Sequence, residues 1–268
     1  MNRRHFLAGS IATLITLPLD AYSSGKGILA SITNVNRLKF TLIEQQTTEL
    51  MINLVAGNLV NFSYQTLSGN QPNTYSNQVY LWEVSDDSIP WSRPAQSSTP
   101  VLLNIPVGDQ NMENVQISTN AYILGYSLAP ATSASVWSDY SNVVACAYIP
   151  PWTEGTENRQ VTQSTCVIDP RYVGSTSLVC YFTFLPGFQA TLSKSWIGIW
   201  PGRSASYTVP PKWFSPLIDA TDSGYAGINN LALAAGEQYT LGLFSGGFNL
   251  DPVKCDLRLL CSVATFST

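Results

Sequence analysis

Three pairs of neighbouring acidic residues are the groups in this sequence best suited to acid–base chemistry. Two carboxylates at a suitable separation could hydrolyse a glycosidic bond, one as the acid and the other as the base or nucleophile. The pairs are Asp86 with Asp87, Glu154 with Glu157, and Asp219 with Asp222. Each pair lies among Ser, Thr, Gly or Pro, a composition typical of solvated turns. We therefore expect no catalytic residue, and a carboxylate-dependent hydrolase is the alternative.

Other catalytic and metal-binding arrangements have less support. Residues 218–227 are rich in oxygen ligands but lack the alternating acidic residues of a calcium-binding loop. His5 is the only histidine, and it lies in a segment that we interpret below as a cleaved export signal. A chain without histidine has no Ser-His-Asp triad, Cys-His pair or histidine metal site. The sequence thus predicts a non-enzyme with no metal and no cofactor.

Tryptophans in turn-rich segments are better candidates for contact with a ligand. Rings carried on the loops of a rigid scaffold can stack on sugar rings or insert into a partner protein. The candidate ligand-binding residues are Trp91, Arg93, Trp137, Trp152 and Trp213. The alternative interpretation is that these rings close the ends of the domains as structural plugs.

Composition limits the class of partner. Charged residues make up 11% of the 268 residues, with 13 Lys and Arg against 17 Asp and Glu. Because there is no basic stripe to neutralise phosphates, nucleic-acid binding is not expected. Carbohydrate or a partner protein is the expected ligand. Low charge with many Tyr and Asn residues also permits self-association through sheet faces or edges, so a self-assembling structural or surface protein is the alternative function.

The N-terminus has the pattern of an export signal. Arg3 and Arg4 precede an uncharged run over 6–19, which is shorter than a membrane-spanning helix needs, and small residues follow. The stretch NRRHFL resembles the twin-arginine signal family, with Asn2 and Ala8 departing from its preferred residues. That resemblance implies a signal over 1–24, export of a folded protein and a periplasmic or secreted location without a transmembrane anchor. A general secretory signal is the alternative.

Five cysteines are present: Cys146, Cys166, Cys180, Cys255 and Cys261. In an oxidising compartment this number favours one or two disulfides with one thiol left over. There is no CxxC spacing, so a zinc or redox motif is not expected.

Short alternating segments recur along the chain and predict strands. Runs rich in Val, Ile, Tyr, Phe and Trp are bounded by Gly, Pro, Asn and Ser, and no segment shows a convincing helical period. Four pairs recur at a nearly constant spacing, which indicates a duplicated unit. They are Leu59 with Leu178, Trp82 with Trp200, Tyr122 with Tyr239, and Cys146 with Cys261. In SKSWIGIWPG, alternation predicts a central strand with its tryptophans in the core.

Each unit resembles an immunoglobulin-like sandwich. Tyr122 and Tyr239 each stand at the start of an expected strand, after a turn, as in the tyrosine corner of that fold. The resemblance implies an all-β protein of two tandem immunoglobulin-like antiparallel β-sandwiches. We expect the first sandwich over 25–150 with extra N-terminal strands, a linker over 151–175 and the second sandwich over 176–268.

Overall fold

The computed structural model describes residues 37–129, 137–153 and 159–268. These residues form sixteen β-strands and two short 3-10 helices, with no α-helix in the described ranges. The strands make four antiparallel sheets that form two β-sandwiches, which confirms the predicted all-β class. The expected export signal lies outside the described residues.

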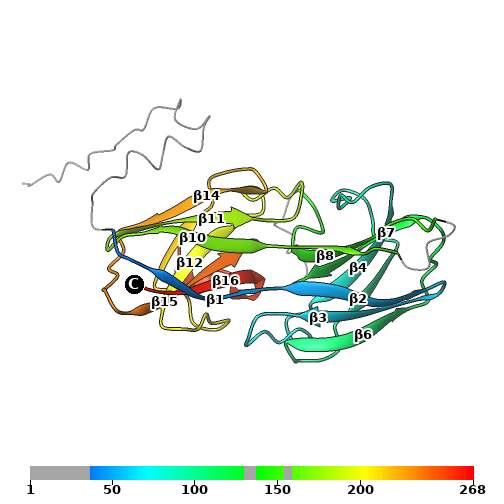
Figure 1. The fold of residues 1–268 in the computed structure, drawn as a ribbon, viewed down its shortest axis with the longest axis horizontal. Helices are drawn as coiled ribbons and strands as arrows, with labels where there is room; N and C mark the ends of the chain where they lie inside the picture. Colours follow the sequence, from blue (N-terminus) through cyan, green and yellow to red (C-terminus); the bar gives the residue numbers. More distant parts are fainter. Residues whose placement is uncertain (1–36, 130–136, 154–158) are drawn as a thin grey trace, which may run out of the picture. The chain divides into compact units, whose positions relative to one another are not determined.

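The first sandwich is built from two sheets of β2–β9. One sheet has the order β2-β3-β6 and the other the order β5-β4-β7-β8-β9 (Figure 1). The bounds are β2 Glu49–Ala56, β3 Leu59–Gln65, β4 Gln78–Val84, β5 Ser97–Pro100, β6 Val107–Glu113, β7 Ala121–Ser127, β8 Val143–Ile149 and β9 Thr162–Thr165.

The second sandwich combines β10–β16 with β1, the first strand of the chain. Its sheets have the orders β10-β11-β14 and β1-β16-β15-β12-β13. The bounds are β1 Thr41–Thr47, β10 Val167–Val173, β11 Ser177–Thr183, β12 Trp196–Pro201, β13 Trp213–Pro216, β14 Ser223–Asn229, β15 Gln238–Phe244 and β16 Leu260–Ser267. The 3-10 helices η2, Pro252–Lys254, and η3, Leu257–Leu259, precede β16.

The boundaries between the sandwiches differ from those expected. Strand β1 falls in the segment assigned to the first sandwich but pairs with β16 of the second. Residues 162–173, expected as linker, form β9 and β10. Strand β1 leads almost directly into β2, and β9 into β10, so two extended segments cross from one sandwich to the other (Figure 1). Sequence alternation identifies strands but not their partners, because a partner distant in the chain leaves no local signal.

The two sandwiches are related by an internal duplication. The sheet orders become identical when β2–β9 are matched to β10–β16 followed by β1. The prediction that Trp82 corresponds to Trp200 is confirmed by their registers. Each ring covers a glycine on the next strand: a Cβ on Gly125 would lie 2.9 Å from the Trp82 ring, and one on Gly242 would lie 2.8 Å from the Trp200 ring.

The expected match of Cys146 to Cys261 is wrong by two positions. Cys146 pairs with Gly125 and Val263 pairs with Gly242, so Val263 is its equivalent. Cys261 instead forms the extra residue of a bulge between β15 and β16, and Val144 forms the same bulge in β8. Similarly, Val60 and not Leu59 corresponds to Leu178 by its pairing in the sheet.

The two tyrosines at the starts of β7 and β15 make the expected hydrogen bonds to the preceding turn. The Tyr122 hydroxyl accepts a hydrogen bond from the Ser118 backbone N–H at 2.9 Å. The Tyr239 hydroxyl accepts one from the Ala234 backbone N–H at 2.9 Å. These bonds secure the turn before each strand, as in a tyrosine corner.

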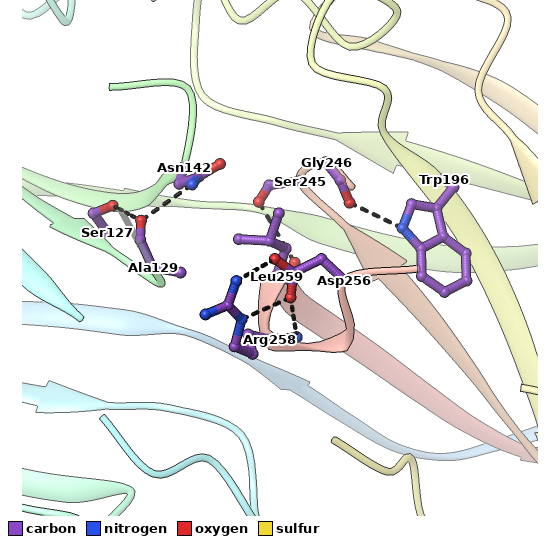
Figure 2. A network of polar contacts seen from close by, with 9 residues as sticks. All are labelled: Ser127, Ala129, Asn142, Trp196, Ser245, Gly246, Asp256, Arg258 and Leu259. Carbon is purple, nitrogen blue, oxygen red and sulfur yellow. Dashed lines mark hydrogen bonds and ion pairs between the residues drawn. The ribbon is translucent and has the colours of Figure 1, made fainter. Parts of the chain in front are cut away.

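The segment SKSWIGIWPG separates two hydrophobic clusters. Ile197 and Ile199 of β12 belong to the main core, whereas Trp196 and Trp200 belong to a second cluster on the outer face of the same sheet. The Trp196 ring stacks on Phe244 with centroids 3.6 Å apart, and its indole N–H donates to the Gly246 carbonyl at 2.9 Å (Figure 2). Both tryptophans are buried, which confirms the prediction of a central strand with core tryptophans.

The expectation of one or two disulfides is wrong for this structure. All five cysteines lie in described residues, and each is buried and free. Several thiols donate to backbone carbonyls, for example Cys180 to Ala226 at 3.6 Å and Cys261 to Leu243 at 3.3 Å. Burial raises the pKa of the Cys146 and Cys180 thiols to about 12.

This burial predicts a loss of stability at alkaline pH. In the unfolded chain the two thiols ionise near their ordinary pKa of 9.0, but in the folded chain they ionise near 12. Between these values the unfolded state binds fewer protons, so the free energy of unfolding should fall by about 1.4 kcal/mol per thiol for each pH unit. Urea unfolding across this range measures the slope. A Cys180→Ala variant should show a shallower slope, and an unchanged slope would contradict the assignment.

Candidate functional site

Two of the predicted ligand-binding tryptophans join the sandwiches to each other. The ring centroids of Trp91 and Trp137 lie 5.3 Å apart. The ring of Phe188, in the second sandwich, contacts both, with its centroid 5.8 Å from that of Trp91 and 5.7 Å from that of Trp137. Trp91 donates its indole N–H to the Pro186 carbonyl at 2.9 Å, and Trp137 donates to Ser193 Oγ at 2.8 Å. These contacts favour the structural interpretation of both rings, and their contact with a ligand stays a prediction.

A second aromatic contact mirrors this one. Trp91, in the loop after β4, contacts Phe188, in the loop after β11. Correspondingly, Tyr207, in the loop after β12, stacks on Tyr75, in the loop after β3, with ring centroids 5.7 Å apart. In each sandwich, therefore, the loop after β4 or β12 contacts the loop after β11 or β3 of the other sandwich. Sequence reasoning missed Tyr75, Phe188 and Tyr207.

Arg93 and Trp213 take no part in those ring contacts. The Arg93 guanidinium donates to the Glu83 carbonyl in a short hydrogen bond. Trp213 is half-buried in β13, and the Lys212 ammonium lies 4.4 Å from its ring centroid. The five predicted residues thus do not converge on one site.

The candidate carboxylates hold turns together. Asp86 accepts the Ser88 backbone N–H at 2.9 Å, and this bond lowers the pKa of the Asp86 carboxyl. Asp222 accepts the Gly187 backbone N–H at 2.9 Å, and Asp219 accepts the Thr221 hydroxyl at 2.8 Å. Glu154 and Glu157 lie outside the described residues.

Trp152, the fourth predicted tryptophan, lines an open groove of about 450 Å³ beside β2. The Trp152 side chain is 47% exposed, the most accessible of the predicted rings. The groove is lined by Ile52, Asn53, Leu54, Val55, Ala56, Gly57, Ile117, Ser118, Trp152, Arg159 and Val161. It therefore combines one edge of a strand, an exposed aromatic ring and a cation.

Trp152 and Arg159, two residues of the groove lining, are hydrogen bonded to backbone carbonyls of residues 118–120. The Trp152 backbone N–H donates to the Thr119 carbonyl at 2.8 Å. The Arg159 guanidinium donates to the carbonyls of Asn120, at 3.2 Å, and Ser118, at 2.5 Å. Because the Ser118 backbone N–H also donates to the Tyr122 hydroxyl, hydrogen bonds through residues 118–120 connect the tyrosine corner, Trp152 and Arg159.

Sequence reasoning identified Trp152 but missed Arg159 and the exposed edge of β2. The signal for that edge is the run LMINLVAG, because its apolar residues do not alternate as they would in a strand with one solvated face. Leu54 is accordingly 53% exposed.

Metal and membrane features were also sought in the described ranges. Within 37–129, 137–153 and 159–268 no three His, Cys, Asp or Glu side chains gather as a metal site. In the same residues, no helix has the length and apolar character to span a bilayer.

Comparison with known proteins adds little to this geometry. No protein-family model matches the chain, and no curated protein matches it. One matching solved structure is described as "Biofilm associated protein - BSP domain", with 12% sequence identity and a TM-score of 0.19. The match covers 75% of this chain but 26% of that one, so this chain spans about a quarter of the matched protein's length. With so low a TM-score, nothing about function follows from the match.

Proposed function

We propose that this chain is an exported, non-catalytic binding protein, and that its ligand lies in the groove beside β2 and contacts Trp152. The observation that carries the proposal is the half-exposed Trp152 ring in the lining of an open groove of about 450 Å³, at a residue whose backbone N–H is bonded to Thr119. Rings held on a rigid support bind ligands at low entropic cost, because little motion is lost on binding. The expected ligand is carbohydrate or a segment of a partner protein.

Two further features support a role in binding. The Arg159 guanidinium adds a fixed cation at the groove, and Asn53 adds an amide that is already hydrogen bonded to Asn61 at 2.9 Å. The carboxylates at Asp86, Asp219 and Asp222 are engaged in turns outside the groove lining. Among the described residues that line the groove there is no Asp or Glu.

Trp152→Ala tests the proposal on immobilised peptides and glycans. We expect the wild-type chain to bind members of one array and the variant to bind them at least ~10-fold more weakly, since a central aromatic contact is worth about 1.4 kcal/mol or more. Trp213→Ala is the matched control, because its ring lies outside the groove. Equal binding by Trp152→Ala and the wild type, or no binding by either, would sink the proposal.

Self-assembly is the second candidate, favoured by apolar side chains exposed along β1 and β2. Leu42 and Ile43 are 42% and 41% exposed, and Met51 and Leu54 are 41% and 53% exposed. Both strands are sheet edges, which a second copy could extend by pairing. Light scattering over a range of concentrations decides: a concentration-dependent mass favours assembly, and a constant monomer mass excludes it.

A further inference from the structure

A smaller pocket, of about 210 Å³, lies where a loop of the first sandwich meets the outer face of the second. Its floor comes from β1, β15 and β16, and its walls come from the loops after β3 and β12. The structure describes both loops throughout, and no described residue lines both this pocket and the groove beside β2. We call it the inter-sandwich pocket.

The loop after β3 is anchored to the second sandwich. Leu67 is buried in the second hydrophobic cluster, and Tyr75, further along the loop, stacks on Tyr207. Ser68, which follows Leu67, lines the pocket, whereas the duplicated loop has Pro186 at this position. The wall from the first sandwich is therefore held by contacts with the second, and it carries a hydroxyl that its duplicate lacks.

Two threonine side chains of the floor are buried. Thr240 and Thr265 are 1% and 4% exposed, and their hydroxyl oxygens lie 3.2 Å apart. Thr240 donates to the Gly202 carbonyl at 3.0 Å, so Thr265 is the donor in the bond between the two threonines. Both hydroxyl hydrogens are thus used within the protein, and Thr265 keeps its lone pairs for a donor in the pocket.

The first sandwich shows that the fold does not require polar residues at these two positions. The registers match Thr240 to Ile123 and Thr265 to Tyr148. Ile123 is fully buried and Tyr148 is half-buried, so an apolar and an aromatic side chain satisfy the same positions. Because burying a hydroxyl costs free energy unless it is hydrogen bonded, the threonine pair is a feature of this pocket and not of the sandwich.

Two opposite charges, Glu44 and Arg203, are exposed and line the pocket. Glu44 lies beside Thr265 in the sheet and accepts a hydrogen bond from the Gln46 amide at 2.5 Å. The Arg203 Nε–H donates to the Gln238 side-chain oxygen at 2.6 Å, which leaves the two terminal guanidinium nitrogens as donors. Among the described residues neither charge belongs to an ion pair, so both can bond a ligand.

We propose that the inter-sandwich pocket binds one neutral sugar ring. A sugar hydroxyl both donates and accepts, and the pocket offers a carboxylate and threonine lone pairs as acceptors and a guanidinium as donor. Leu67, Leu260 and Val263 add apolar surface for the C–H face of the ring. One negative and one positive charge in the lining favour an uncharged ligand.

The size of the pocket agrees with a ligand of this kind. Its volume is that of about seven waters, and it is smaller than the pockets that hold drug-sized ligands. This site goes beyond the proposed function, because it does not involve Trp152 or the groove beside β2.

Ligand-observed NMR titrations of the full chain with D-glucose, D-galactose and D-mannose test the inference. We expect saturable binding of at least one hexose with a dissociation constant on the order of 1 mM, as for other ligands of this size. Glu44→Gln should weaken binding at least ~10-fold, because it removes the charge from a hydrogen bond. Ser204→Trp, a bulky change at an exposed lining residue, should abolish binding. Glu237→Gln is the matched control, since Glu237 is exposed and lies outside the lining.

Several outcomes would overturn the sugar site. They are the absence of saturable hexose binding, hexose binding that Glu44→Gln and Ser204→Trp leave unchanged, and Glu44-dependent binding of glycine in place of any hexose. Trp152→Ala should leave hexose binding unchanged. Loss of hexose binding in that variant, with binding retained in Glu44→Gln, would overturn this inference and keep the proposed function. Glu44-dependent hexose binding by a chain whose other ligands do not need Trp152 would do the reverse.

Discussion

Replacing Trp196 by Ala should lower the free energy of unfolding by about 4 kcal/mol, the middle of the range for deletion of a buried aromatic ring. Trp196 is fully buried in the second hydrophobic cluster and stacks on Phe244 with an angle of 5° between the rings. The variant would also leave the Gly246 carbonyl without its indole donor (Figure 2). A buried acceptor without a partner costs about 1–3 kcal/mol.

Urea unfolding measures this loss of free energy, and the stabilities of two further variants serve as comparisons. Trp196→Phe restores part of the ring but not the hydrogen bond, so its stability should fall between those of Trp196→Ala and the wild type. Trp152→Ala removes a half-exposed ring and should cost less than about 1 kcal/mol. If Trp196→Ala were no less stable than Trp152→Ala, the second cluster would contribute little to the fold.

The contrast between these tryptophans shows what the sequence could predict. In SKSWIGIWPG, period-two alternation places Trp196 and Trp200 on one face and predicts their burial, because strand geometry is local. The tyrosine corners at Tyr122 and Tyr239 are predicted by the resemblance of each unit to an immunoglobulin-like sandwich. Local patterning therefore accounts for the fold class, for most strands and for the duplicated unit.

The partners of those strands could not be predicted in the same way. Strand β1 pairs with β16, at the opposite end of the chain, and the residues taken as a linker form two strands. Pairing between distant segments depends on which edges remain open once the sheets form. That is a property of the whole fold and not of any short window of sequence.

The loop tryptophans illustrate the same limit at the candidate site. Trp91, Trp137 and Trp152 all lie in turn-rich segments, and composition alone does not distinguish them. Their environments separate them: Phe188 contacts the first two, which are half-buried, whereas Trp152 is 47% exposed in the groove lining. The groove itself lies beside β2, which among the described strands is at the edge of its sheet, and no short run of sequence shows that position.

Replacing Phe188 by Ala should cost about 3–4 kcal/mol and loosen the contact between the sandwiches. Phe188 is buried and contacts Trp91 and Trp137 of the first sandwich. Within its own sandwich it stacks on Phe184, with ring centroids 4.3 Å apart. Its removal would expose both indoles to water, so tryptophan emission should shift to longer wavelength in the folded variant. Equilibrium unfolding should also broaden, since the two sandwiches would unfold less cooperatively.

A double-mutant cycle distinguishes this interface from ordinary core packing. Phe188→Ala and Trp137→Ala should show a coupling energy of about 1 kcal/mol, as expected for aromatic side chains in contact. Phe62→Ala, a buried residue of the first sandwich's own core, should destabilise by a similar amount but add independently to Trp137→Ala. Independent effects of Phe188 and Trp137 would mean that their contact does not hold the sandwiches together. The Trp137 ring would then be available to a ligand, as its place in a turn-rich segment predicts.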